Sequence, residues 1–143
     1  MELRETFGTS TARLCDGALT IGTGKMERTW RWTGDGFSSV ALRDLSSGAE
    51  WAGDAANADW RLPGWRDANP PAELVSVTAG EDSDEGFTSP HLAVVAEMLY
   101  PAAKLRLRFT VWAYPGAMGL RTQLEVQALA GYEGEVARSS GRA

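Results

Sequence analysis

Residues 92–129, LAVVAEMLYPAAKLRLRFTVWAYPGAMGLRTQLEVQAL, carry the clearest structural signal in the chain. Apolar and polar residues alternate there with the period of two that places successive side chains on opposite faces of a sheet, which predicts strands at 92–100, 104–113 and 118–129. The side chains expected to face the core are Leu105, Leu107, Phe109 and Val111 in the middle strand and Met118, Leu120, Thr122, Leu124 and Val126 in the last. This stretch therefore predicts an antiparallel meander with one face in water.

The rest of the chain repeats the pattern in shorter pieces separated by turn residues. Asp16-Gly17 predicts a tight hairpin, because both central residues of such a turn must tolerate positive φ. Pro115-Gly116 suits a second tight turn between the last two strands. No segment shows a helical period over three turns. We therefore predict an all-β fold, an antiparallel β-sandwich, with further strands at 11–15, 18–22, 25–32, 37–45, 50–51 and 73–79.

The length of 143 residues suits one domain with a single hydrophobic core. We expect an N-terminal extension at 1–10, the β-sandwich at 11–130 and a frayed or truncated tail at 131–143, where the alternation is lost. The acidic run at 80–86, GEDSDEG, is expected to be a solvated turn.

The net charge of −5 argues against nucleic acid as a partner, because such binding depends on Lys and Arg neutralising phosphates. No stretch approaches the roughly 18 apolar residues of a membrane span, so no membrane partner is expected. The first residues lack a basic segment followed by an apolar run, which favours the cytoplasm only weakly and leaves the location open. Cys15 is the single cysteine and is expected to be a small buried hydrophobe.

No catalytic, metal or cofactor site is predicted. His91 is the only histidine, which excludes an arrangement of two histidines, and we expect it to cap the start of a strand. Asp54, Asp59 and Asp67 lie among Gly, Ala, Asn and charged residues, so ordinary solvated carboxylates are expected rather than a catalytic pair. The acidic run lacks the spacing of a calcium loop.

One long loop carries the only candidate site. From 52 to 71 the alternation fails, and long ordered loops in compact domains are often functional. Sugars offer apolar faces to aromatic rings and hydroxyls to charged side chains. The expected substrate-binding set is therefore Trp60, Trp65, Asp59, Arg61, Arg66 and Asp67. The alternative is that Trp60 and Trp65 only cover the end of a sheet or the interface with another domain.

The chain also resembles the N-terminal domain of family 36 glycoside hydrolases, the α-galactosidase group. The resemblance rests on ALTIGTGKMERTWRW at 18–32, GFSSVALRDLSSGAEWAG at 36–53 and the long strand pair at 96–129. Within these stretches the matching elements are Gly22-Thr23-Gly24, Glu27-Arg28-Thr29-Trp30, Ser38 to Asp44 and Gly48 to Trp51. The resemblance covers about residues 11–130, and none of these positions performs chemistry.

What the resemblance implies is a supersandwich of the galactose-mutarotase type, of which this chain would be a part. In that family the catalytic aspartates lie in a (β/α)8 barrel, which this chain does not contain. The resemblance thus implies a non-catalytic domain that supports the assembly and substrate mouth of a glycoside hydrolase in carbohydrate metabolism. Its partners would be the rest of the parent enzyme or a neighbouring subunit, and a galactoside-type carbohydrate.

Two other functions fit the residues. One is a freestanding carbohydrate-binding, lectin-like module in which the tryptophan-rich loop holds a glycan directly. The other is a structural protein-interaction domain whose exposed face docks onto another protein.

Overall fold

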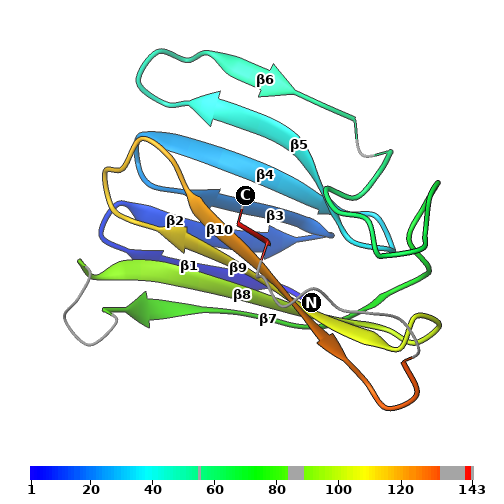
Figure 1. The fold of residues 1–143 in the computed structure, drawn as a ribbon. Coiled ribbons are helices and arrows are strands. Elements are labelled where there is room, and N and C mark those ends of the chain that lie inside the picture. The colour runs from blue at the N-terminus through cyan, green and yellow to red at the C-terminus, as the bar shows by residue number, and fades with distance from the viewer. Residues whose placement is uncertain (55, 84–88, 133–140, 143) are drawn as a thin grey trace.

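The computed structural model describes residues 1–54, 56–83, 89–132 and 141–142 as two antiparallel sheets without a helix (Figure 1). The six-stranded sheet has the order β1 (Leu3–Phe7), β2 (Ser10–Cys15), β3 (Ala18–Gly22), β4 (Met26–Trp32), β5 (Phe37–Asp44) and β6 (Glu50–Ala52). The five-stranded sheet has the order β11 (Gly141–Arg142), β10 (Arg121–Ala128), β9 (Leu105–Ala113), β8 (His91–Tyr100) and β7 (Glu73–Asp82).

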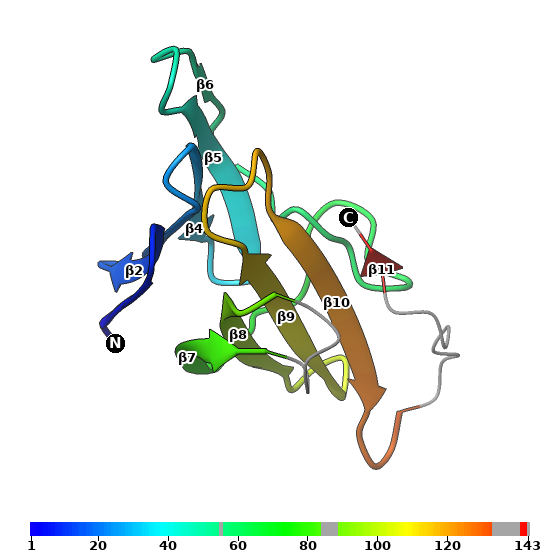
Figure 2. The same ribbon diagram turned by 90° about the vertical axis from the view of Figure 1, so that its left-hand side faces the viewer.

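The sheets pack face to face, which confirms the predicted all-β class and the antiparallel sandwich (Figures 1 and 2). Along one side, β1 lies next to β7. Along the opposite side the edges of the two sheets are not aligned. There β6 and part of β5 extend beyond the edge of the five-stranded sheet (Figures 1 and 2). The inner face of the six-stranded sheet is thus covered at β1–β3 and open at its far edge.

Both predicted tight turns are present. Asp16 and Gly17 have φ of 50° and 78°, as the hairpin between β2 and β3 requires. In the turn between β9 and β10, the Ala117 amide donates to the Tyr114 carbonyl at 3.0 Å, and Gly116 has a φ of 76°. The Thr23 hydroxyl also donates to the Ala117 carbonyl at 2.6 Å. This second turn therefore fastens one sheet to the other.

Aromatic rings join the sheets at the centre of the core. Leu105, Leu107, Phe109 and Val111 of β9 are buried, as their alternation predicts. The Phe109 ring meets Trp30 of β4 nearly at right angles, with ring centroids 5.6 Å apart. Offset and edge-to-face contacts of this kind add to the gain from burial alone. The core is therefore organised around one phenylalanine.

A β-bulge interrupts the pairing of β4 with β5. Thr29 lies opposite Ala41 and Trp30 opposite Ser39, so Val40 is the extra residue. A bulge shifts the alternation by one residue. As a result, Ser39 and Leu42 lie on the same inner face although they are three positions apart.

Two side-chain expectations were wrong. Met118 is 69% exposed instead of facing the core, because the connection after the turn continues past Gly119 and β10 begins only at Arg121. Cys15 is exposed rather than buried, because the alternation that buries Leu14 directs the next residue to the outer face.

The segment boundaries also differ from the expected ones. Residues 1–10 contain β1, which pairs along its whole length with β2, and its Leu3 and Phe7 pack against the core. The strand β7 runs on to Asp82, so the start of the expected acidic turn is strand. The remainder of that turn at 84–86 lies outside the described residues, as do 133–140 and 143 of the expected tail.

We predict that Phe109→Ala lowers the free energy of unfolding by about 3–5 kcal/mol, because it leaves a cavity between the sheets. Total stabilities are about 5–15 kcal/mol, so the loss should be plain in urea unfolding followed by tryptophan fluorescence. Met118→Ala is the control and should change stability by no more than about 0.5 kcal/mol. A similar small change in both variants would contradict the central role of Phe109.

Candidate functional site

The long connection at 53–72 between the sheets is held by one buried asparagine. The Asn69 side-chain oxygen accepts from the Leu62 amide at 2.7 Å, and its amide group donates to the carbonyls of Trp60 at 3.0 Å and Asp35 at 3.3 Å. The Asn69 backbone amide donates to the Asp35 carboxylate at 3.1 Å. Asp35 lies in the turn between β4 and β5, so this turn serves as the anchor of the loop.

Tyr100 ties the same turn to the second sheet. Its hydroxyl donates to the Asp35 carbonyl at 2.6 Å and accepts from the Trp60 indole nitrogen at 2.9 Å. Burial is the main cause that raises the pKa of Tyr100 to about 12, so the hydroxyl stays protonated and can donate. The Trp60 ring also packs on Phe109, with centroids 5.3 Å apart. Trp60 thus packs, partly buried, against the hydrophobic core.

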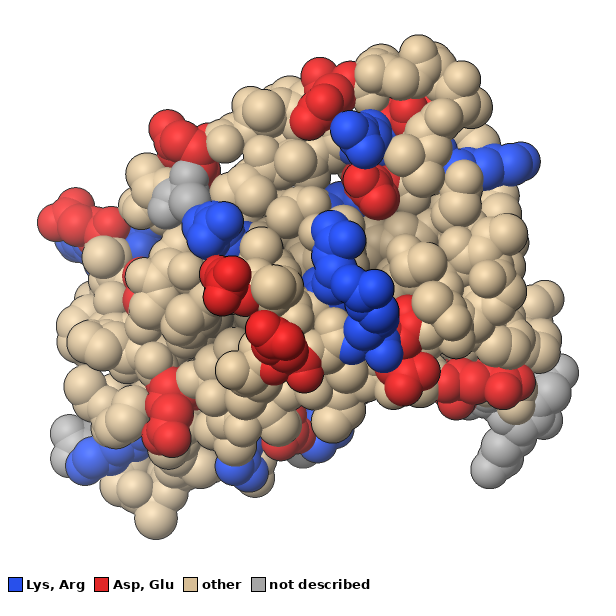
Figure 3. Space-filling view, turned by 180° about the vertical axis from the view of Figure 1, so that it is seen from behind, with Lys and Arg blue, Asp and Glu red and all other residues tan. Residues whose placement is uncertain are grey.

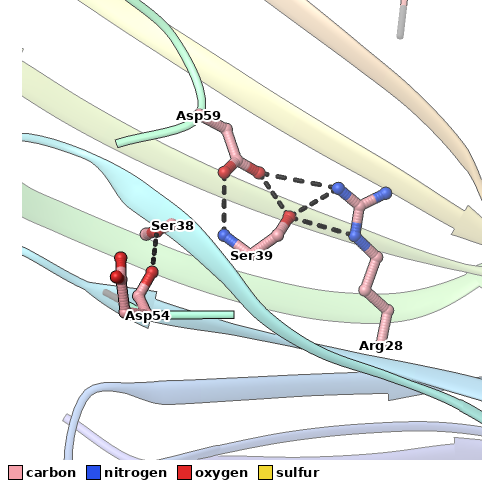
Figure 4. A network of polar contacts seen from close by, with 5 residues as sticks. All are labelled: Arg28, Ser38, Ser39, Asp54 and Asp59. Atoms are coloured by element: carbon pink, nitrogen blue, oxygen red, sulfur yellow. Dashed lines mark hydrogen bonds and ion pairs between the residues drawn. The ribbon is translucent and has the colours of Figure 1, made fainter. Parts of the chain in front are cut away.

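Asp59, by contrast, belongs to a polar cluster on the inner face of the six-stranded sheet (Figure 4). Its carboxylate accepts from the Ser39 amide at 2.8 Å and from the Ser39 hydroxyl at 2.5 Å. Arg28 of β4 donates to the Ser39 hydroxyl and lies 3.6 Å from the Asp59 carboxylate, with its guanidinium 4.8 Å above the Trp30 ring. Ser39 faces inward because it lies two residues after the buried Phe37 in β5 and opposite Trp30 of β4.

Two exposed apolar side chains continue the row that begins at Arg28. Leu42 lies opposite Arg28 across β4 and β5, and Trp51 lies opposite Leu42 across β5 and β6, so all three share one face. Leu42 is 43% exposed and Trp51 is 53% exposed. We call this surface, formed by Arg28, Ser39, Leu42, Trp51 and Asp59, the open strip. It lies where β5 and β6 extend beyond the second sheet (Figure 2).

The Trp51 ring packs against the backbone of Gly53. A Cβ atom added at Gly53 would come within 2.6 Å of the ring, so the indole rests on the bare backbone of Gly53. The Gly53 amide in turn donates to the carbonyl of the bulge residue Val40 at 2.8 Å. An exposed indole supported on one side is a rigid surface that costs little conformational entropy when a partner covers it.

The residues that the sequence analysis selected for the loop do not gather in one place. Asp59 belongs to the open strip, and Trp60 packs against the hydrophobic core. The other four residues are exposed on the rest of the loop: Arg61, Trp65, Arg66 and Asp67. Trp65 is 38% exposed. Within the described ranges, no ion pair or side-chain hydrogen bond engages Arg61, Arg66 or Asp67.

Four members of the open strip were missed from the sequence: Arg28, Ser39, Leu42 and Trp51. Arg28 offered one signal, since its position on a strand face with Trp30 required a polar partner. Trp51 was visible as an aromatic residue at the start of the loop.

The chain matches no protein-family model, curated protein or solved structure. The open strip is therefore interpreted from its own chemistry.

Two groups that could perform acid–base chemistry, His91 and Asp59, make contacts within the fold. His91 is 1% exposed, with Nδ1 2.8 Å from the Ser89 carbonyl and Nε2 3.2 Å from the Asp82 carboxylate, and it stacks on Tyr114. The Asp59 carboxylate accepts from Ser39 and lies 3.6 Å from the Arg28 guanidinium.

Among the described residues, one group of side chains has the spacing to share a metal ion: Glu2, Cys15 and Asp16, whose ligand atoms lie within 4.8 Å of one another. All three are exposed, and the Cys15 sulfur lies 4.0 Å from Glu2 and 3.8 Å from Asp16. The described part of the chain contains no helix that could span a bilayer.

We predict that Tyr100→Phe lowers the free energy of unfolding at pH 7 by about 1–3 kcal/mol, because the Trp60 indole and the Asp35 carbonyl lose a buried partner. The loss of unfolding free energy caused by Tyr100→Phe should become smaller at high pH. Tyrosine ionises near pH 10 in the unfolded chain but only near 12 in the folded one, so its contribution is complete below pH 10 and is lost as pH rises to 12.

Urea unfolding of both proteins at pH 7, 9 and 11 tests this. The gap between wild type and Tyr100→Phe should be equal at pH 7 and 9 and narrower at pH 11. A gap that widens at pH 11 would contradict the assigned burial of the hydroxyl.

Proposed function

We propose that this protein is a non-catalytic β-sandwich domain of a glycoside hydrolase resembling the α-galactosidases, and that it docks through the open strip onto the rest of that enzyme or onto a neighbouring subunit. The observation that carries the docking role is the uncovered inner face at β5 and β6, with Leu42 and Trp51 exposed side by side. The link to glycoside hydrolases comes from the resemblance of 11–130 to that family.

Physical reasoning supports docking at this place. The inner face of a sandwich is normally covered by a second layer, and contiguous exposed apolar surface marks interaction sites. Interfaces commonly combine a central Trp or Arg anchor with a polar rim. The open strip offers an indole, an aliphatic side chain and the Arg28–Asp59 pair in one row.

The second candidate is a carbohydrate-binding module for galactoside-type sugars. It is favoured by the neighbourhood of the exposed Trp51 ring and the Asp59 and Arg28 side chains, because a pyranose stacks on an indole while charged groups bind its hydroxyls. A structural protein-interaction domain would use the same strip for a partner unrelated to hydrolases.

We predict that a photo-crosslinking amino acid in place of Trp51 forms an adduct, in cells of the native host, with a polypeptide segment that carries a glycoside hydrolase barrel. The same replacement at Trp65 is the matched control and should give no such adduct. Mass spectrometry of the products identifies the partner. Adducts with unrelated proteins alone would favour the structural interaction domain instead.

Isothermal titration calorimetry of the chain with galactose and with raffinose distinguishes the docking role from the sugar-binding alternative. The docking proposal expects no saturable heat from either sugar. Saturable binding that is lost in Trp51→Ala and retained in Trp65→Ala would overturn it in favour of a carbohydrate-binding module.

A further inference from the structure

A second, separate surface lies on the outer face of the six-stranded sheet. Figure 3 shows the molecule from behind, with a group of basic side chains at the centre of the view, acidic side chains beside it and further basic side chains elsewhere. In the pairing of β1 with β2, Arg4 lies directly opposite Arg13. Both side chains are exposed. Directly opposed residues in an antiparallel pair have Cβ atoms about 4.5–5.5 Å apart, and like charges in these positions are destabilising.

Two other arginines in the sheets lie opposite a carboxylate. Arg43 lies opposite Glu27 and is 3.4 Å from its carboxylate, and Arg108 lies opposite Glu97 at 3.0 Å. Within the described ranges, no carboxylate lies at ion-pair distance from Arg4 or Arg13, although the chain carries more acidic than basic residues. In the same sheet, Arg43 thus has a carboxylate opposite it, whereas Arg4 and Arg13 lie opposite each other.

The surroundings of the pair form a hollow. It is lined by Glu2, Leu3, Arg4, Arg13, Leu14, Cys15, Ala18 and Thr20. Thr20 lies opposite Arg13 across β2 and β3, and its hydroxyl is 2.9 Å from that of Thr29 on β4. When Thr29 donates in that contact, the Thr20 hydrogen is free to point into the hollow.

The hollow thus presents donors in a row across three strands. A guanidinium has five N–H donors and no acceptor, so two of them beside a hydroxyl are suited to bind the acceptor oxygens of one ligand. Glu2 also lines the hollow, but its carboxylate lies near the Cys15 sulfur, at 4.0 Å, and not at ion-pair distance from either arginine. Among the described residues, the row therefore has no carboxylate within ion-pair distance of either arginine.

We infer that Arg4 and Arg13 form a binding site for a single oxyanion, a carboxylate, sulfate or phosphate group, held between the two guanidiniums with Thr20 as a further donor. The fork of N–H groups on each arginine matches two oxygens of such a group. An anion between the two cations replaces their mutual repulsion with two attractions. The overall charge of −5 disfavours an extended polyanion, so the ligand is a small molecule or one charged group of a larger neutral one.

This site is independent of the proposed function. It lies on the outer face of the sheet, whereas the open strip lies on the inner face. Variants of one surface therefore leave the other unchanged, and each proposal can fail alone.

Amide chemical shifts of the complete chain test the inference. Inorganic phosphate, inorganic sulfate and galacturonate are titrated separately at low ionic strength, with chloride as the reference ion, because exposed charge pairs are screened by salt. We expect at least one of the three to give saturating shifts in β1 and β2. Saturation with phosphate or sulfate assigns a tetrahedral oxyanion, and saturation with galacturonate alone assigns a sugar carboxylate.

Variants separate the site from general charge attraction. Arg13→Gln and Arg4→Gln should each abolish saturation, and Arg13→Lys, which keeps the charge but loses the fork, should weaken binding about tenfold or more. Arg43→Gln removes an equal charge from the same sheet and should leave the affinity unchanged. The inference is overturned if no oxyanion saturates beyond chloride, or if Arg43→Gln weakens binding as much as Arg13→Gln.

Discussion

The contact of Phe109 with the rings of Trp30, Phe37 and Trp60 is the interaction on which the rest of this structure depends. These rings come from β9, β4, β5 and the long connection, so one cluster sets the distance between the two sheets and the position of the chain that joins them. Large aromatic side chains dominate the energetics of a small core, since each buries far more apolar surface than an aliphatic one. The cluster does not reach β6 or the end of β5 that pairs with it.

Around this apolar centre, polar groups determine the path of the long connection. A segment of this length without secondary structure must satisfy its backbone groups in other ways. Asn69 supplies bonds to Leu62, Trp60 and Asp35, and Tyr100 joins Asp35 to the second sheet. The loop is therefore a fixed part of the domain, and Asp59 is held where Ser39 and Arg28 can meet it.

The two candidate surfaces lie on opposite faces of the six-stranded sheet. On the inner face, the mismatch between the layers leaves Leu42 and Trp51 uncovered. On the outer face, the register of β1 with β2 brings two arginines together, and no carboxylate of the described residues lies within ion-pair distance of them. Both surfaces depend on pairings between strands and neither contains a set of residues adjacent in sequence. For this reason the candidate set taken from the loop was only partly brought together by the fold.

The alternation of apolar residues was sufficient by itself to determine the all-β class, the long strands, the Asp16-Gly17 hairpin and the inward face of β9, because these follow from local periodicity and turn chemistry. The tertiary structure alone decided the bulge at Val40, the exposure of Met118, the pairing of β1 and the opposition of Arg4 to Arg13. Each of these depends on which strand lies next to which and where a strand begins. The physical reason is that a shift of one residue in register reverses the face of every side chain after it, and the local pattern does not contain that register.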